Sequence, residues 1–186
     1  ADVDALKKAG AGLPSLIEAA EMASTAKTPA DWQAVAKKLV DATTQSPELV
    51  AKGLQKAADN LPEPAKSIIK DDAVAKELAN ATPDTLKALI DGDPMKALKG
   101  LADNKALREA VIDAAIKHDP DNKFKDAMSK IGIDVKNEGD VAALKKASAG
   151  LPSLIEAAEM AATAKTPADW QAVAKKLVDA TTQSPE

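Results

Sequence analysis

The chain repeats itself over a long period, and this repeat limits its fold more than any other feature. The segment "LPSLIEAAEMA" occurs at 13–23 and again at 151–161. The match extends outward, so that residues 2–48 align with 140–186 at a constant offset of about 138 residues. The two copies differ only at small or surface-tolerant positions, namely Asp4/Ala142, Gly10/Ser148 and Ser24/Ala162. Near-identity of this kind indicates a tandem array of one structural unit.

The repeat predicts where the units lie. Residues 1–138 would form one full unit, and residues 139–186 would form the first third of the next. The segment "IGIDVKNEGD" at 131–140 has two glycines and no helical pattern, so it is the predicted joint. A permuted division, with a domain at 49–186 and a spare copy at 1–48, remains open. Both ends look like cuts in a longer chain, because the second copy stops at "SPE" where the first continues.

Proline after Ser, Thr or Asp marks repeated helix starts along the chain. The side chain of the preceding residue can cap free amides, and proline suits the first helical position. The five sites are "KTPADW", "QSPELV", "ATPDTL", "GDPMKA" and "HDPDNK". The stretches between them have apolar residues at helical spacing, and none alternates as a strand would. We therefore predict an all-α fold of short helices and helical hairpins, for which a solenoid-like stack is one arrangement.

The predicted core is thin. Apolar residues make up 45% of the chain, but many are alanine, and aromatic residues are only 2%. The largest apolar side chains are Trp32, its copy Trp170, and Phe124. We expect each tryptophan to be mostly buried as an anchor of this core. Alternatively, Trp32, Trp170, Phe124 and Met128 line an apolar pocket or anchor an interface with a partner.

The sequence lacks the residues and motifs of several kinds of catalytic, metal-binding and cofactor-binding site. There is no cysteine, which excludes thiolate catalysis and zinc–thiolate sites. The single histidine, His118, precedes "DP" at a predicted helix end, where a cation suits the helix dipole. Neither a nucleophile elbow nor a phosphate-binding glycine motif occurs. We therefore predict no catalytic residues, no metal site, no cofactor and no enzymatic activity.

The composition also limits the classes of partner that the chain is expected to bind. The chain has one arginine, Arg108, and few aromatic residues, so we predict no nucleic-acid partner. No apolar run reaches the length of a transmembrane helix. We predict a non-enzymatic repeat module that acts as a spacer or as a scaffold for protein partners or neighbouring repeats, in a bacterial surface or secreted protein. The alternative is a carrier of a small apolar ligand such as a lipid, which would need a closed apolar cavity of several hundred Å³ per unit.

Overall fold

The fold is all-α, as predicted. The computed structural model describes residues 10–119 and 121–183, and within these ranges there are helices and turns but no strand. The chain forms two compact units, residues 1–100 and 101–186, which divide within helix α7 (Pro94–Asp103). This division differs from the boundary of the sequence repeat, and the prediction that repeats meet near 131–140 stays a prediction.

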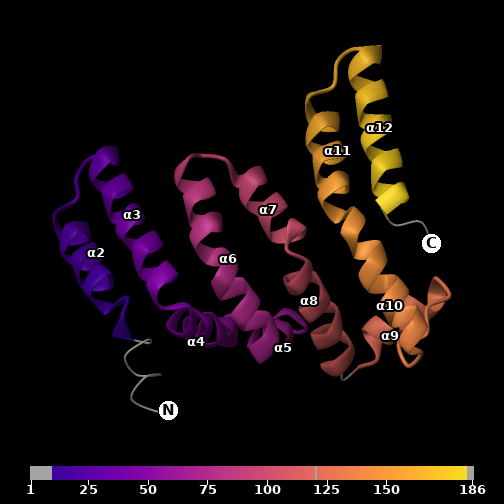
Figure 1. The fold of residues 1–186 in the computed structure, drawn as a ribbon, viewed down its shortest axis with the longest axis horizontal. Helices are drawn as coiled ribbons and strands as arrows, with labels where there is room; N and C mark the ends of the chain where they lie inside the picture. Colours follow the sequence, from indigo (N-terminus) through magenta and orange to yellow (C-terminus); the bar gives the residue numbers. More distant parts are fainter. Residues whose placement is uncertain (1–9, 120, 184–186) are drawn as a thin grey trace. The chain divides into compact units, whose positions relative to one another are not determined.

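The first unit is built around a helical hairpin. Helices α2 and α3 are antiparallel, α6 packs against α3, and α4 packs against α6 (Figure 1). The short elements η1 and α5 pack together and connect α4 to α6. The bounds in chain order are α2 (Leu13–Thr25), α3 (Pro29–Gln45), α4 (Pro47–Ala57), η1 (Ala58–Asn60), α5 (Ala65–Lys70) and α6 (Asp72–Ile90).

The core of this unit consists mostly of alanine. Val74 and Ser46 are the largest of the described side chains that are fully buried. The other buried residues of these helices are small: Ala19, Val35, Ala42, Ala58, Ala75, Ala79 and Ala88. Small side chains let helix axes approach closely but remove little apolar area from water. The packing of this unit therefore depends on close helix–helix contact and not on large buried side chains.

Gly12 shows how close this contact is. Its N–H donates to the Ser46 hydroxyl oxygen at 2.7 Å, a buried bond that ties the start of α2 to the end of α3. A Cβ atom at Gly12 would lie 2.5 Å from the Ala42 carbonyl oxygen and 2.8 Å from the Ser46 hydroxyl oxygen. The site therefore accommodates glycine alone without a shift of the backbone. Ser46 was expected to cap α4 through its side chain, but its hydroxyl serves this contact between helices instead.

The predicted helix start at Pro83 is wrong. Helix α6 begins at Asp72, capped by the Asp71 side chain, and runs through Pro83 to Ile90. An interior proline costs roughly 3 kcal/mol because it lacks an N–H and crowds the preceding turn. The hydroxyl groups of Thr82 and Thr85 donate to carbonyl oxygens in the adjacent turns, at 2.7 and 2.8 Å. Packing against both α3 and α4 holds the helix continuous across the proline.

Three of the other four predicted helix starts are confirmed. Helices α3, α4 and α7 begin at Pro29, Pro47 and Pro94, as expected. The start predicted at "HDPDNK" is displaced, because α9 begins at Lys123. Pro120 itself lies outside the described residues.

The second unit contains a hairpin of its own. Helices α11 and α12 are antiparallel, and α10 leads into α11 through the short element η2 (Figure 1). Helix α8 packs against both α9 and α10. The bounds are α8 (Lys105–Lys117), α9 (Lys123–Lys130), α10 (Glu138–Ala147), η2 (Ser148–Gly150), α11 (Leu151–Thr163) and α12 (Pro167–Gln183). The buried residues of these helices include Leu107, Ala114, Ala157, Val173 and Ala180.

The irregular segment at 131–140 has a defined, hydrogen-bonded path. Gly132 ends α9 with a positive φ of 83°, which glycine adopts without strain. The N–H groups of Gly132 and Ile133 donate back to the carbonyls of Ser129 and Met128, the pattern of a Schellman motif. The Asn137 side chain then caps α10 by accepting from Gly139 and Asp140. Two glycines here therefore do not produce an unstructured linker.

We predict that Gly12→Ala destabilises the chain by roughly 1–3 kcal/mol, because the new methyl group overpacks the contact between α2 and α3. Gly53→Ala is the matched control, since nothing lies within 4 Å of a Cβ atom at this helical position. That change should stabilise the chain by about 0.5–1 kcal/mol. Urea denaturation followed by circular dichroism measures both, and equal effects would contradict the close contact.

Candidate interaction surface

The two near-identical segments fold into hairpins with the same internal packing. In the first, Ala19, Val35 and Ala42 are buried between α2 and α3. Their counterparts between α11 and α12 are Ala157, Val173 and Ala180, which are buried to the same degree. Small residues thus form the same hairpin interface twice, in two different units.

An ion pair across each hairpin repeats as well. Lys38 on α3 pairs with Glu18 on α2 at 2.5 Å, and Lys176 pairs with Glu156 at 2.5 Å. The Glu18 carboxylate raises the pKa of Lys38 above its ordinary value through a hydrogen bond and charge attraction. Because these pairs are substantially solvent-exposed, they orient the helices more than they stabilise them.

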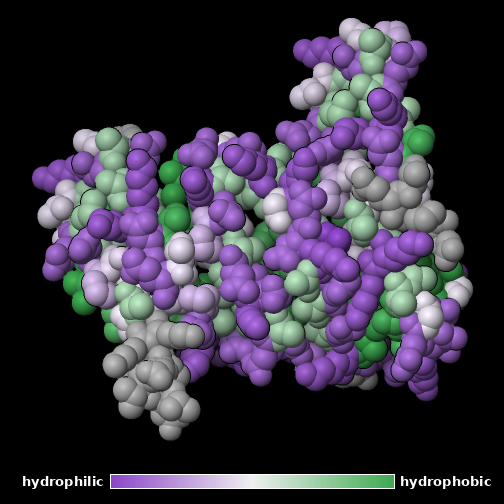
Figure 2. Space-filling view, viewed as in Figure 1, coloured by the Kyte–Doolittle hydropathy of each residue, from purple (hydrophilic) through white to green (hydrophobic). Residues whose placement is uncertain are grey.

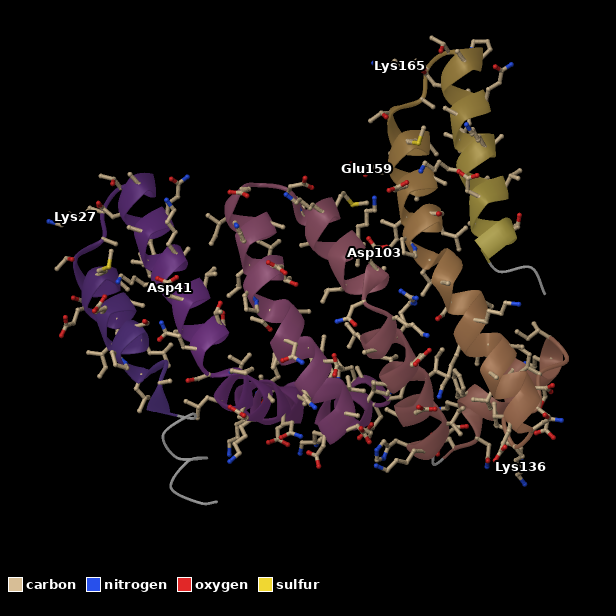
Figure 3. All side chains as sticks on the ribbon, in the orientation of Figure 1. Lys27, Asp41, Asp103, Lys136, Glu159 and Lys165 are labelled. Atoms are coloured by element: carbon tan, nitrogen blue, oxygen red, sulfur yellow. The ribbon has the colours of Figure 1, made fainter. Side chains whose placement is uncertain are left out.

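The turn at the tip of each hairpin positions a tryptophan. Lys27 and Lys165 lie at these two tips (Figure 3). In the first hairpin the Asp31 carboxylate accepts from the N–H groups of Lys27 and Thr28 at 3.0 and 2.8 Å, while the Thr28 hydroxyl accepts from Asp31 N–H. This capping box fixes the first turn of α3 and hence the direction of Trp32.

The second hairpin has the same cap. Asp169 accepts from the N–H groups of Lys165 and Thr166 at 2.9 and 2.8 Å, and its own N–H donates to the Thr166 hydroxyl at 3.2 Å. The N–H of each tryptophan's backbone donates to the threonine carbonyl at 3.2 Å, from Trp32 to Thr28 and from Trp170 to Thr166. Both tryptophans are therefore set by the same local structure.

The expectation that the tryptophans are core anchors is wrong. Trp32 and Trp170 are each 53% exposed. The narrow groove between two helices that meet through alanine and valine has no room for an indole ring, so the ring lies outside the interface. Equal exposure in both copies makes the tryptophans surface features of the hairpin, and an exposed aromatic side chain is a common anchor for a partner.

Other apolar side chains gather on the same hairpins. Most of the described large apolar residues that are exposed lie on α2, α3, α11 and α12: Leu13, Leu16, Ile17, Trp32, Leu39, Leu151, Leu154, Trp170, Leu177 and Val178. The face drawn in Figure 2 is mostly hydrophilic, with hydrophobic residues in smaller separate areas. The exposed apolar side chains of the hairpins therefore lie on a surface that is otherwise largely hydrophilic on this face.

One row of residues distinguishes the two copies. Ala36, Val40 and Thr43 follow one another at helical spacing on α3 and are half-buried. The identical row on α12 is Ala174, Val178 and Thr181, and all three are exposed, Val178 by 61%. We call this row the lateral stripe. Each helix packs on the other helix of its hairpin. In addition, α3 packs on α4 and α6, whereas α12 packs on η2, so α4 and α6 account for the cover on α3.

The remaining predicted anchors, Phe124 and Met128, lie one turn apart on α9 and are both half-buried. Helix α9 packs against α8, while the helix that carries Trp170 packs against α11. Neither they nor the tryptophans line any of the three hollows described below. Their role as pocket or interface residues stays a prediction.

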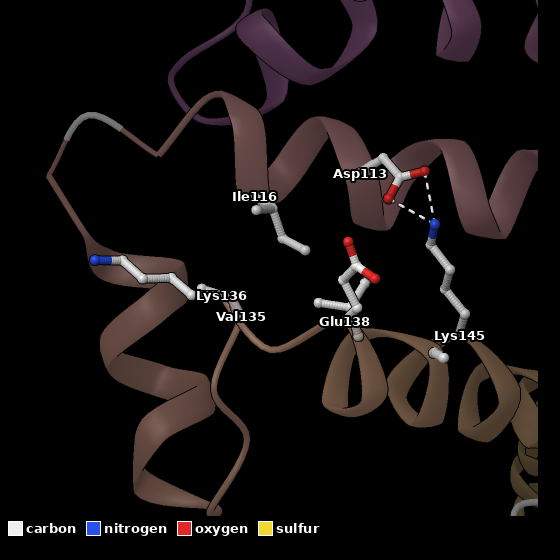
Figure 4. Close-up of a pocket in the computed structure, with 8 residues that line it drawn as sticks. Asp113, Ile116, Val135, Lys136, Glu138 and Lys145 are labelled. Carbon is white, nitrogen blue, oxygen red and sulfur yellow. Dashed lines mark hydrogen bonds and ion pairs between the residues drawn. The ribbon is translucent and has the colours of Figure 1, made fainter.

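The largest of these hollows, about 350 Å³, lies in the second unit between α8 and the segment that enters α10 (Figure 4). An ion pair between Lys145 and Asp113, at 2.7 Å, closes one end of it. Lys136 and Glu138 add further charge to its lining. Because half of its lining residues are charged and it is open to the solvent, this hollow is a poor container for an apolar molecule.

Two smaller hollows lie in the first unit. One of about 290 Å³ between α4 and α6 has charged residues in its wall, among them Glu48, Lys52 and Asp72. The other, about 210 Å³, is lined mainly by apolar residues of α2, α3 and α4, including Leu16 and Val50. Its volume is below the usual range for ligand pockets.

The titratable residues form no metal-binding cluster in the part of the chain that the structure covers. No three carboxylate or histidine side chains converge there as metal ligands. His118 lies at the C-terminal end of α8, the helix end at which it was expected. None of the described helices is both long and apolar enough to span a bilayer.

Comparison of the chain with models of protein families, with curated proteins and with solved structures finds no match.

We predict that the two tryptophans are equally accessible in solution. Trp32→Phe and Trp170→Phe each leave one tryptophan, and acrylamide should quench the fluorescence of both variants with the same constant. Trp32→Ala should cost less than the roughly 3–5 kcal/mol of a fully buried aromatic side chain. Protection of one tryptophan from quenching would contradict the equal exposure.

The capping boxes predict an acid-sensitive component of stability. Hydrogen bonds from Lys27 and Thr28 N–H hold the pKa of Asp31 below its ordinary value, and those from Lys165 and Thr166 do the same for Asp169. A lowered folded-state pKa gives stability that is complete above the unfolded-state pKa, about 4, and is lost as pH falls through the folded-state pKa.

The double variant Asp31→Asn/Asp169→Asn tests this, because it removes both charges. Wild type should melt at the higher temperature near pH 6, and the difference between the two should shrink as pH falls below about 4. Asp41→Asn, on the exposed surface of α3, is the matched control. A difference that stays constant with pH would show that the caps do not act through their charge.

Proposed function

We propose that this chain is a non-enzymatic module of a tandem-repeat protein, which serves as a structural spacer and as a scaffold for protein partners. The observation that carries the proposal is the duplicated hairpin with its tryptophan exposed to the same 53% in both copies. A residue displayed at a fixed position in each repeat gives an array evenly spaced anchor points. Repetition of a weak contact then raises the overall affinity for a multivalent partner.

The construction of the hairpins supports a mechanical role. Capping boxes, cross-hairpin ion pairs and alanine contacts are all local, so each repeat can fold from contacts within itself and with its neighbours. Chains of this kind lengthen by addition of units without any change in their core. A solenoid-like stack, and display on a bacterial surface or in a secreted protein, are parts of the same proposal.

Carriage of a small apolar ligand is the alternative. It would require a closed apolar cavity, whereas the three described hollows are open and two of them are partly charged. The scaffold proposal therefore has the better support.

The experiment for the spacer role is small-angle X-ray scattering on proteins with one, two and three copies of the period. The maximum dimension should grow by a constant increment with each copy, because repeats add along a line. Growth with the cube root of mass would indicate that copies collapse into one globule. That result would end the spacer proposal.

A further inference from the structure

The lateral stripe of α12 is an apolar helix face whose cover can be identified inside the same chain. Helix α3 has the sequence "PADWQAVAKKLVDATTQ", and α12 has the same seventeen residues. The two hairpins share the small buried residues between their helices, the ion pair and the cap, although α11 also buries Pro152 and Ser153 where Pro14 and Ser15 of α2 are not buried. A difference in exposure between equivalent residues therefore reports what packs on the hairpin from outside.

The gain in exposure on α12 is confined to one side of the helix, while Asp179 changes in the opposite sense, from exposed at Asp41 to half-buried. Ala34 and Ala172 are both half-buried, and Lys37 and Lys175 are both exposed. Only along the lateral stripe does each residue change from half-buried on α3 to exposed on α12. A change in exposure at three successive positions of one row indicates a single covering surface on α3 rather than scattered side-chain movement.

We propose that the lateral stripe of α12 is a docking surface for the α4–α6 segment of a further copy of the repeat. On α3 this stripe is covered by α4 and α6, with α6 directly beside α3 (Figure 1). Because α12 presents the same side chains in the same hairpin, a second α4–α6 segment finds the same surface there. This inference rests on the repeat architecture of the proposed function and names the surface through which a repeat is completed.

The occupant is defined by its chemistry. Helix α6 packs against α3, and its buried residues include Val74, Ala75 and Ala79, small apolar side chains that allow its neighbours to approach closely. A helix with bulky side chains at its buried positions would be held away from the alanine of the stripe. The surface therefore favours an α6-type helix over a general amphipathic partner.

Two proteins test the proposal, residues 1–186 and the same chain extended after Glu186 by the sequence of residues 49–100. Val178→Asp places a charge on the exposed stripe. In the 1–186 chain it should leave the melting midpoint almost unchanged, because Val178 is already 61% exposed. In the extended chain it should lower the midpoint of the C-terminal repeat by roughly 5–10 °C, because the charge would then be covered.

Two further variants complete the design. Val40→Asp, the equivalent change under α6, should lower the midpoint in both proteins. Gln171→Asp adds the same charge at a position that is exposed in both copies, Gln33 and Gln171, and should act equally in the two proteins. Amide exchange in α12 should slow by at least about tenfold when the chain is extended.

The proposal is overturned if Val178→Asp has the same small effect in both proteins, or if α12 exchanges equally fast in both. It also fails if Val40→Asp leaves the midpoint unchanged, since the covered stripe would then contribute nothing in either copy. These outcomes are independent of the scattering test, because an array of uncovered hairpins would still lengthen by a constant increment per copy.

Discussion

Close approach of helices through alanine and glycine is the constraint on which this structure depends. Gly12 lies against the Ala42 carbonyl and the Ser46 hydroxyl, and alanines occupy most of the buried positions of the first unit. A core of this kind stabilises through many short contacts, each of small area. It also leaves no room for large side chains, which is why indole rings and many leucines lie on the surface of the hairpins.

Local signals in the sequence predicted the helices well where the signal itself forms the structure. Thr28 and Asp31 make the capping box that "KTPADW" indicates, and no strand occurs in the ranges 10–119 and 121–183. The same reasoning failed at Pro83, because packing of α6 on two neighbours overrides a local breaking signal. It failed at Ser46 as well, where a tertiary hydrogen bond takes the hydroxyl that was assigned to a cap.

Most of the candidate surface could not be predicted from the sequence. Trp32 is the largest apolar residue of its helix, so burial was the natural expectation, yet the helices are too close together to enclose it. The lateral stripe could not have been found at all, because α3 and α12 are identical in sequence and differ only in their surroundings. A signal did exist for the interface itself, since Ala19, Val35 and Ala42 are small residues repeated at equivalent positions.

The link between α3 and α4 has a consequence for how an array of identical hairpins folds. Ser46 alone separates Gln45 from Pro47. In a protein with many equivalent hairpins, an α4–α6 segment faces several copies of the same surface and could pair with any of them. A one-residue tether holds the segment beside its own hairpin at an effective concentration on the order of millimolar or above, which distant copies cannot match. In an array of the kind we propose, the short link therefore favours pairing of each segment with its own hairpin over exchange of segments between repeats.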